Sequence, residues 1–173
     1  MYKIIKEYVC NYAVVASRPG NGKTATIIEN IKDDLKNNKK VLLFSLESSK
    51  DEIFKRSEIK NDNLIVLDSP IEKLYDIIDE INKYKPDIVY IDYYDLLPNT
   101  TEVDELLYQA TRDYNIPIIV ARNLSEENDN YNLSTITFEQ FCKINGSSMM
   151  NKADNYYLLA INDKQNLNIR RLK

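Results

Sequence analysis

Two of the chain's three glycines lie within the segment SRPGNGKT (residues 17–24), whose last two residues are a lysine and a threonine. A short apolar run precedes this segment, and a stretch of helical periodicity follows it. Glycines at a strand-to-helix turn let successive backbone N–H groups converge on one point at the positive end of the helix. A phosphate group accepts hydrogen bonds from such an arrangement. The pattern therefore predicts a phosphate-binding loop.

The lysine and the threonine have defined tasks in such a loop. Lys23 is predicted to reach the β- and γ-phosphates of ATP, and Thr24 is predicted to hold Mg²⁺. The strict motif has glycine at the position of Ser17, so this chain carries a relaxed form, and an ordinary glycine turn is the alternative. The residues of the loop that are predicted to bind nucleotide are Ser17, Arg18, Pro19, Gly20, Asn21, Gly22, Lys23 and Thr24.

A phosphate loop of this kind needs a carboxylate that positions the magnesium ion. The segment DIVYID (residues 87–92) supplies Asp92 at the end of an apolar run. Any buried strand that ends in aspartate has the same pattern, and that purely structural interpretation is the alternative. Because a phosphate loop precedes it in the chain, we expect Asp92 to lie at the metal site with Thr24.

Two further polar side chains follow apolar runs. Glu47 follows the run at 41–46 and is predicted, with Lys23, to be catalytic, because hydrolysis needs a group that orients or deprotonates water. Asn123 follows the run at 116–121, where an amide can contact the γ-phosphate. The alternatives are an acid favoured by a helix dipole for Glu47 and an ordinary loop amide for Asn123.

Short β-branched runs alternate with longer segments of helical period, which predicts βαβ units and a mostly parallel sheet. Strands are expected at residues 8–16, 41–46, 63–67, 87–91, 116–121, 156–162 and 167–172. Helices are expected at residues 24–37, 49–57, 70–84, 101–114 and 137–143. The fold class is therefore α/β, with helices on both faces of the sheet. No linker divides the chain, so residues 1–173 are expected to form one domain.

Two local signals refine this outline. The helix at 70–84 is expected to start with a capping box, in which Ser69 caps, Pro70 takes the first helical position and Glu72 completes the box. The polar turn NDKQN (residues 162–166) is short enough to join the last two strands into an antiparallel hairpin. The hairpin is predicted to lie at one edge of the sheet.

Composition excludes several classes of protein. With 43% hydrophobic and 29% charged residues the chain is expected to fold, and its net charge of −4 argues against coating DNA by charge alone. The sequence contains no histidine, which excludes a Ser-His-Asp triad and makes a zinc site hard to build. Cys10 and Cys142 are expected to be buried, reduced thiols, and no run is long enough to span a membrane. A cytoplasmic location is therefore predicted.

Four segments together resemble the ATPase domain of DnaB-type replicative helicases, within the RecA-like P-loop group. They are VVASRPGNGKTA, KKVLLFSLESS, DIVYIDYYDLL and YNIPIIVARNLS, in the order of that family. The family commonly has alanine at the first position of the loop and keeps an Arg-Pro pair like the one here. The resemblance implies a RecA-like core with strand order 5-1-4-3-2. It also implies Glu47 as the catalytic glutamate, Asp92 as the magnesium-site acid and Asn123 as the γ-phosphate sensor.

The chain also departs from this pattern. The intervals that follow Glu47 and Asp92 are shorter than in the family, and the second of them includes loop surface that members use toward single-stranded DNA. The N-terminal domain and linker helix of the family do not precede the first strand. The sequence ends at Lys173, before the position of a lysine and an arginine finger that act on a neighbour's nucleotide. The finger is therefore expected to lie outside this sequence or to be missing.

Three functions remain in competition. The first is a motor that binds and hydrolyses ATP with Mg²⁺, self-associates through its nucleotide face and acts on single-stranded DNA in DNA replication. The alternative is a nucleotide-dependent binding or regulatory module, such as a helicase loader or the partner of a replication protein, with little hydrolysis and no unwinding. A small P-loop kinase fits the length, but such enzymes need an arginine-rich lid, and the arginines of this chain are scattered.

Overall fold

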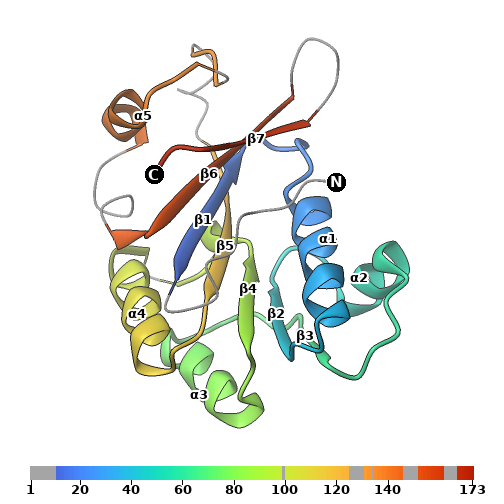
Figure 1. Cartoon of the computed structure of the whole chain (residues 1–173). Coiled ribbons are helices and arrows are strands. Elements are labelled where there is room, and N and C mark those ends of the chain that lie inside the picture. Colours follow the sequence, from blue (N-terminus) through green and yellow to red (C-terminus); the bar gives the residue numbers. More distant parts are fainter. Residues whose placement is uncertain (1–10, 99, 125–130, 134, 146–151, 162–166) are drawn as a thin grey trace.

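The computed structural model describes residues 11–98, 100–124, 131–133, 135–145, 152–161 and 167–173. The strands are β1 (Tyr12–Ser17), β2 (Val41–Ser45), β3 (Leu64–Leu67), β4 (Ile88–Asp92), β5 (Ile118–Asn123), β6 (Asn155–Ile161) and β7 (Leu167–Arg171). The helices are α1 (Lys23–Lys36), α2 (Lys50–Ser57), α3 (Tyr75–Tyr84), α4 (Thr100–Asp113) and α5 (Phe138–Asn145), with a 3₁₀ turn η1 (Tyr94–Leu96). Helices α1 and α2 lie on one side of the sheet, and α3 and α4 lie on the other (Figure 1).

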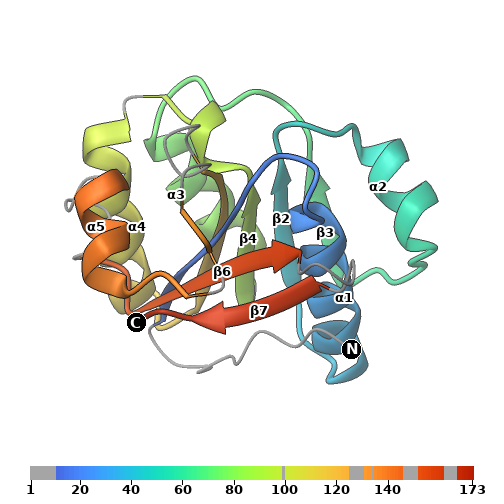
Figure 2. The ribbon, with the colours of Figure 1, turned by 90° about the horizontal axis from the view of Figure 1, so that it is seen from above.

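The strands form one seven-stranded sheet in the order β3-β2-β4-β5-β1-β6-β7. Every pairing is parallel except β6 with β7, whose arrows run in opposite directions in Figure 2. When β1, β2, β4, β5 and β6 are numbered as five core strands, their order is 5-1-4-3-2. The predicted α/β class with a C-terminal antiparallel pair is confirmed. The turn at 162–166 lies outside the described residues.

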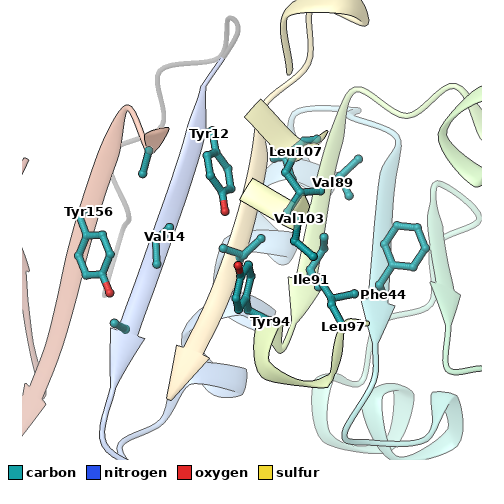
Figure 3. Close-up of a cluster of buried hydrophobic side chains, with 14 of the residues drawn as sticks. Tyr12, Val14, Phe44, Val89, Ile91, Tyr94, Leu97, Val103, Leu107 and Tyr156 are labelled. Carbon is teal, nitrogen blue, oxygen red and sulfur yellow. The ribbon is translucent and has the colours of Figure 1, made fainter. Parts of the chain in front are cut away.

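The central strands are apolar on both faces, because helices cover both sides of the sheet. On β1, Val14 packs into the core under α3, α4 and α5, whereas Val15 packs into the core under α1 and α2. Figure 3 shows the first of these cores, with Val103 and Leu107 of α4 beside strand residues such as Ile91. This double burial holds the ends of the strands, where the polar residues lie, in fixed positions.

Several element boundaries differ from the prediction. Helix α3 begins at Tyr75 and not at residue 70, and its first turn is fixed by the Lys73 N–H, which donates to Asp76 Oδ2 at 2.9 Å. Strand β5 continues through Asn123, because that residue pairs with Ser17 in the parallel ladder. Asn123 therefore ends the strand and does not lie beyond it. Of the strand expected at 8–16, residues 8–10 lie outside the described residues.

A buried hydrogen bond between the sheet and α1 leads to a prediction about the free energy of unfolding. The Tyr90 hydroxyl donates to Asp34 Oδ2 at 2.7 Å, and both side chains are fully buried. Tyr90→Phe leaves a buried carboxylate oxygen without this donor, so the free energy of unfolding should fall by about 1–3 kcal/mol. In a thermal unfolding experiment, the melting temperature should fall by about 2–4 °C for each kcal/mol lost in a chain of this size. Tyr75→Phe, at a side chain that is 70% exposed, is the control, and equal losses in both variants would contradict the prediction.

Candidate functional site

The loop between β1 and α1 has the backbone that glycine permits. Gly20 and Gly22 have φ angles of +77° and +80°, in the left-handed region that other residues rarely adopt. A Cβ atom on Gly20 would meet open space, so the backbone angle, and not crowding, requires glycine there. Gly22 is the N-cap of α1, and no side chain caps the helix. The first N–H groups of α1 are thus available to an anion.

Lys23 lies at the start of α1, with its side chain directed to the ends of β1 and β5. Its Nζ donates to Asn123 Oδ1 at 2.5 Å and to Ser17 Oγ at 3.4 Å. Both acceptors are present because Ser17 and Asn123 are directly paired in the parallel ladder. Burial lowers the pKa of Lys23, while Asp92, Glu47 and Asp95 nearby oppose this change.

Asp92 ends β4 and lies beneath the loop. Its Oδ2 accepts a hydrogen bond from Thr24 Oγ1 at 2.7 Å, and the side chain is only 2% exposed. Its Oδ1 is also buried, and within the described part of the chain nothing donates to it. Burial raises the pKa of Asp92, an effect that the hydrogen bond from Thr24 opposes. A buried carboxylate oxygen with spare acceptor capacity is suited to a cation or to a water molecule that a cation holds.

The donor set at this point fits magnesium. Mg²⁺ prefers oxygen ligands and is usually bound by one or two protein groups together with phosphates and water. Thr24 Oγ1 and Asp92 Oδ2, 2.7 Å apart, are such a pair. Among the described residues, no group of three or more acidic or thiol side chains is arranged to hold a metal ion without other ligands.

Glu47 lies two residues beyond the end of β2, in a bend that two hydrogen bonds fix. The Leu46 N–H donates to the carbonyl of Asp92 at 2.8 Å, and Ser45 Oγ donates to the carbonyl of Ser48 at 2.6 Å. These contacts place the exposed Glu47 side chain on the wall of a cavity of about 520 Å³. The cavity is lined by Pro19, Gly20, Gly22, Lys23, Thr24, Ala25, Glu47, Ser48, Glu52, Arg56 and Asn123.

The remaining loop residues have different positions. Ser17 is fully buried and its Oγ donates to the carbonyl of Arg18 at 2.8 Å. Arg18 does not line the cavity, and its guanidinium donates to the carbonyl of Tyr131 at 3.3 Å. The Asn21 N–H donates to the carbonyl of Arg18 at 3.2 Å, which closes the turn. Pro19 lines the cavity, so the structure brings most of the predicted residues together and directs the Arg18 side chain elsewhere.

Sequence reasoning missed the two cavity residues that α2 contributes, Glu52 and Arg56, as well as Ala25 and Ser48. A capping box starts this helix: the Glu52 N–H donates to Ser49 Oγ at 3.3 Å, and the Ser49 N–H donates to Glu52 Oε2 at 3.1 Å. The spacing of four residues puts Glu52 and Arg56 on one face of a helix. The sequence contained this signal, but only the packing of α2 shows that this face looks into the cavity.

The buried carboxylate of Asp92 leads to a second prediction, about the melting temperature. Burial raises the pKa of Asp92 in the folded protein. Such a group stabilises the fold at a pH below its unfolded pKa, and this stability is lost as the pH rises through the folded pKa. At neutral pH the ionised Asp92 therefore lowers the stability of the protein. Asp92→Asn should therefore raise the melting temperature of the nucleotide-free protein at pH 7, and the difference should close in acid. Asp79→Asn, at an exposed position, is the control; a lower melting temperature for Asp92→Asn alone would contradict the prediction.

The loop, the cavity and the parallel sheet together define a P-loop nucleotide-binding protein of the α/β class. Comparison with models of known families identifies the family of the chain. The thymidine kinase family model matches residues 12–144, which is most of the chain. The chain therefore belongs to the thymidine kinase family. A search of curated proteins gave no match.

The family assignment corrects the sequence interpretation. The resemblance to DnaB-type helicases is wrong as an assignment of family, and scattered arginines do not exclude a P-loop kinase. The resemblance has a physical basis in the fold. A solved structure described as an "ATPase Domain" matches with a TM-score of 0.79 and 19% identity, over 94% of this chain and 76% of that one.

A second solved structure, of "A DnaB-Like Replicative Helicase And Its Interactions With Primase", matches with a TM-score of 0.77 and 18% identity. The match covers 94% of this chain and 55% of that one, so this chain spans about half the length of the helicase. Likeness at this identity shows a shared fold and no more. Among the described residues, no helix is long and apolar enough to cross a membrane.

Proposed function

We propose that this protein binds ATP with Mg²⁺ at the P-loop and hydrolyses its terminal phosphate bond. The observation that carries the proposal is the pair of hydrogen bonds from adjacent residues, Lys23 to Asn123 and Thr24 to Asp92. They put an amine and a hydroxyl of the loop beside an amide and a carboxylate from two other strands. Phosphoryl transfer depends on positioned cations and dipoles of this kind more than on covalent chemistry.

Each residue has a separate task in this proposal. The loop from Ser17 to Gly22 and the N-terminus of α1 hold the phosphates, and Lys23 exchanges its bond with Asn123 for the β- and γ-phosphates. Thr24 and Asp92 hold Mg²⁺, which neutralises the charge that develops on the phosphate oxygens.

The transfer step then uses Glu47. Its carboxylate takes a proton from a water molecule in the cavity, and the water oxygen bonds to the γ-phosphorus. The bond between that phosphorus and the bridging oxygen breaks, and ADP leaves with the electron pair. Asn123, at the end of β5, contacts the γ-phosphate until it departs.

A second candidate differs only in the acceptor. Membership of the thymidine kinase family favours transfer to the 5′-hydroxyl of thymidine, with Glu47 accepting the proton of that hydroxyl. The lining of the cavity favours water. Among its described residues only Pro19 and Ala25 are apolar and none is aromatic, although Tyr93, whose side chain hydrogen-bonds to Asn123, lies beside it. Hydrolysis is therefore the first candidate and nucleoside phosphorylation the second.

Product analysis separates the two candidates. The protein is incubated with radiolabelled ATP, Mg²⁺ and thymidine, and the label is followed into inorganic phosphate or thymidine monophosphate. Hydrolysis predicts phosphate at a rate that thymidine does not change. Label in the nucleotide would replace the first candidate with the second, and ATP binding with neither product would leave the regulatory module.

The predicted partners are tested in the same assay. Single-stranded DNA is added to the turnover reaction, and the size of the protein is measured with a non-hydrolysable ATP analogue. A motor that acts on DNA as a ring or filament should be stimulated by DNA and should grow in size. A monomer without stimulation would argue against both single-stranded DNA and a second copy as partners, and would leave a separate replication protein as the remaining prediction.

A further inference from the structure

The cavity has a wall that the proposed reaction does not yet use. Opposite the phosphate loop, α2 contributes Glu52 and Arg56, which lie one helical turn apart. Ile53 and Ser57, the residues that follow each of them, are buried, and Ile53 packs into the core with strand residues. The buried pair fixes the rotation of α2, so the face with Glu52 and Arg56 is held toward the cavity.

The Arg56 side chain is available to bind an anion. Within the described part of the chain its guanidinium makes no hydrogen bond or ion pair. Its neighbour Glu52 is already engaged by the backbone N–H and the hydroxyl of Ser49, at 3.1 and 3.3 Å. Arg56 lines the same cavity as Lys23 and Thr24 of the phosphate loop. An exposed guanidinium on the wall of the cavity that the phosphate loop also lines is placed for a phosphate oxygen.

We propose that Arg56 contacts the γ-phosphate of ATP bound to the same chain and stabilises the charge of the transition state. This inference rests on the proposed function and adds to it a catalytic cation supplied in cis. Arginines that act in this way account for about 10³–10⁵ in turnover in P-loop enzymes. Arg56 would make the site complete within one chain, with no arginine from a neighbour.

The first test compares Arg56→Ala with Lys55→Ala, which removes a charge from the adjacent, exposed position of α2 outside the cavity. Turnover by Arg56→Ala should fall by about 10³ or more, whereas Lys55→Ala should stay within about twofold of wild type. Arg56→Lys should recover only part of the rate, because an ammonium group lacks the planar fork. The affinity for ADP should not change, since ADP has no γ-phosphate. Equal turnover in Arg56→Ala and Lys55→Ala would overturn the inference.

The second test distinguishes action within a chain from action on a neighbour. Arg56→Ala is mixed with Lys23→Ala, which lacks the loop lysine but keeps Arg56. If Arg56 acts in cis, the mixture is no more active than the sum of its parts. Restored turnover in the mixture would show that Arg56 reaches a neighbour's nucleotide and would overturn the assignment in cis.

A binding measurement separates this inference from the proposed function. If the wild type binds ATP but does not turn it over, hydrolysis fails as the function, and Arg56 is judged on affinity alone. Arg56→Ala should then weaken a non-hydrolysable ATP analogue by about tenfold or more relative to ADP, as expected for the loss of a charged hydrogen bond. An unchanged ratio would overturn the inference. A wild type that binds no nucleotide would overturn the proposed function, and the inference with it.

Discussion

Lys23→Ala is expected to weaken ATP binding by about 100-fold or more, which corresponds to about 2.7 kcal/mol. The amine of Lys23 donates to Asn123 and Ser17, and burial lowers its pKa. A triphosphate that enters the cavity gives the amine stronger partners than an amide and a hydroxyl, because charged hydrogen bonds are about twice as strong as neutral ones. Isothermal titration with ATP and Mg²⁺ measures the change.

Lys36→Ala is the matched control, because it removes an exposed lysine from the other end of the same helix. Both variants should melt close to the wild type without nucleotide, since Asn123 is only half-buried and water can replace the lost amine. Retained affinity in a folded Lys23→Ala would refute the assignment of the phosphate loop. A loss that Lys36→Ala shares would show instead that α1 was disturbed.

The sequence was sufficient to predict the parts of the site that depend on local chemistry. The glycines before Lys23 predict a turn that only glycine adopts, and Gly20 and Gly22 have the left-handed angles that this requires. The apolar run before Asp92 predicts a buried strand with an acid at its end, and that acid accepts from Thr24. These features need only the neighbouring residues and the period of the chain.

The sequence was not sufficient to predict features that depend on tertiary packing. Ser69, Pro70 and Glu72 fit the start of a helix, but α3 begins at Tyr75, because the contact between Lys73 and Asp76 fixes its first turn. Caps are weak local signals, and a single competing hydrogen bond can displace them. The same holds for Arg56 in the functional site. Its residue type and its position in the sequence were known, but its place on the cavity wall depends on how α2 packs against the sheet.

Local motifs in this chain do not distinguish one P-loop family from another. The motifs shared with DnaB-type helicases lie at the carboxyl ends of parallel strands, where the common fold places similar residues in different families. The match to the thymidine kinase family extends over residues 12–144 and so includes the segments between these motifs. A phosphate loop with an acid on a neighbouring strand therefore defines a class of nucleotide-binding site, but it does not distinguish a kinase from a motor.

Glu47→Gln is expected to reduce turnover by about 10²–10⁴ while ATP binding stays within about threefold of the wild type. Glutamine keeps the shape of the side chain and its hydrogen-bonding capacity, but it cannot accept the proton of the attacking hydroxyl. The bend that carries Glu47 is fixed through backbone and serine contacts, from Leu46 to Asp92 and from Ser45 to Ser48, which this substitution leaves unchanged.

The prediction holds for either acceptor, because water and a nucleoside hydroxyl must both lose a proton as the new bond forms. Glu72→Gln, at an exposed position outside the cavity, is the control for the loss of one negative charge. If Glu47 only interacts with the dipole of α2, Glu47→Gln will lower the melting temperature slightly and leave turnover intact, and the catalytic assignment will be refuted. If turnover falls while ATP binding is kept, binding and chemistry are separated: Lys23 serves mainly the first, and Glu47 only the second.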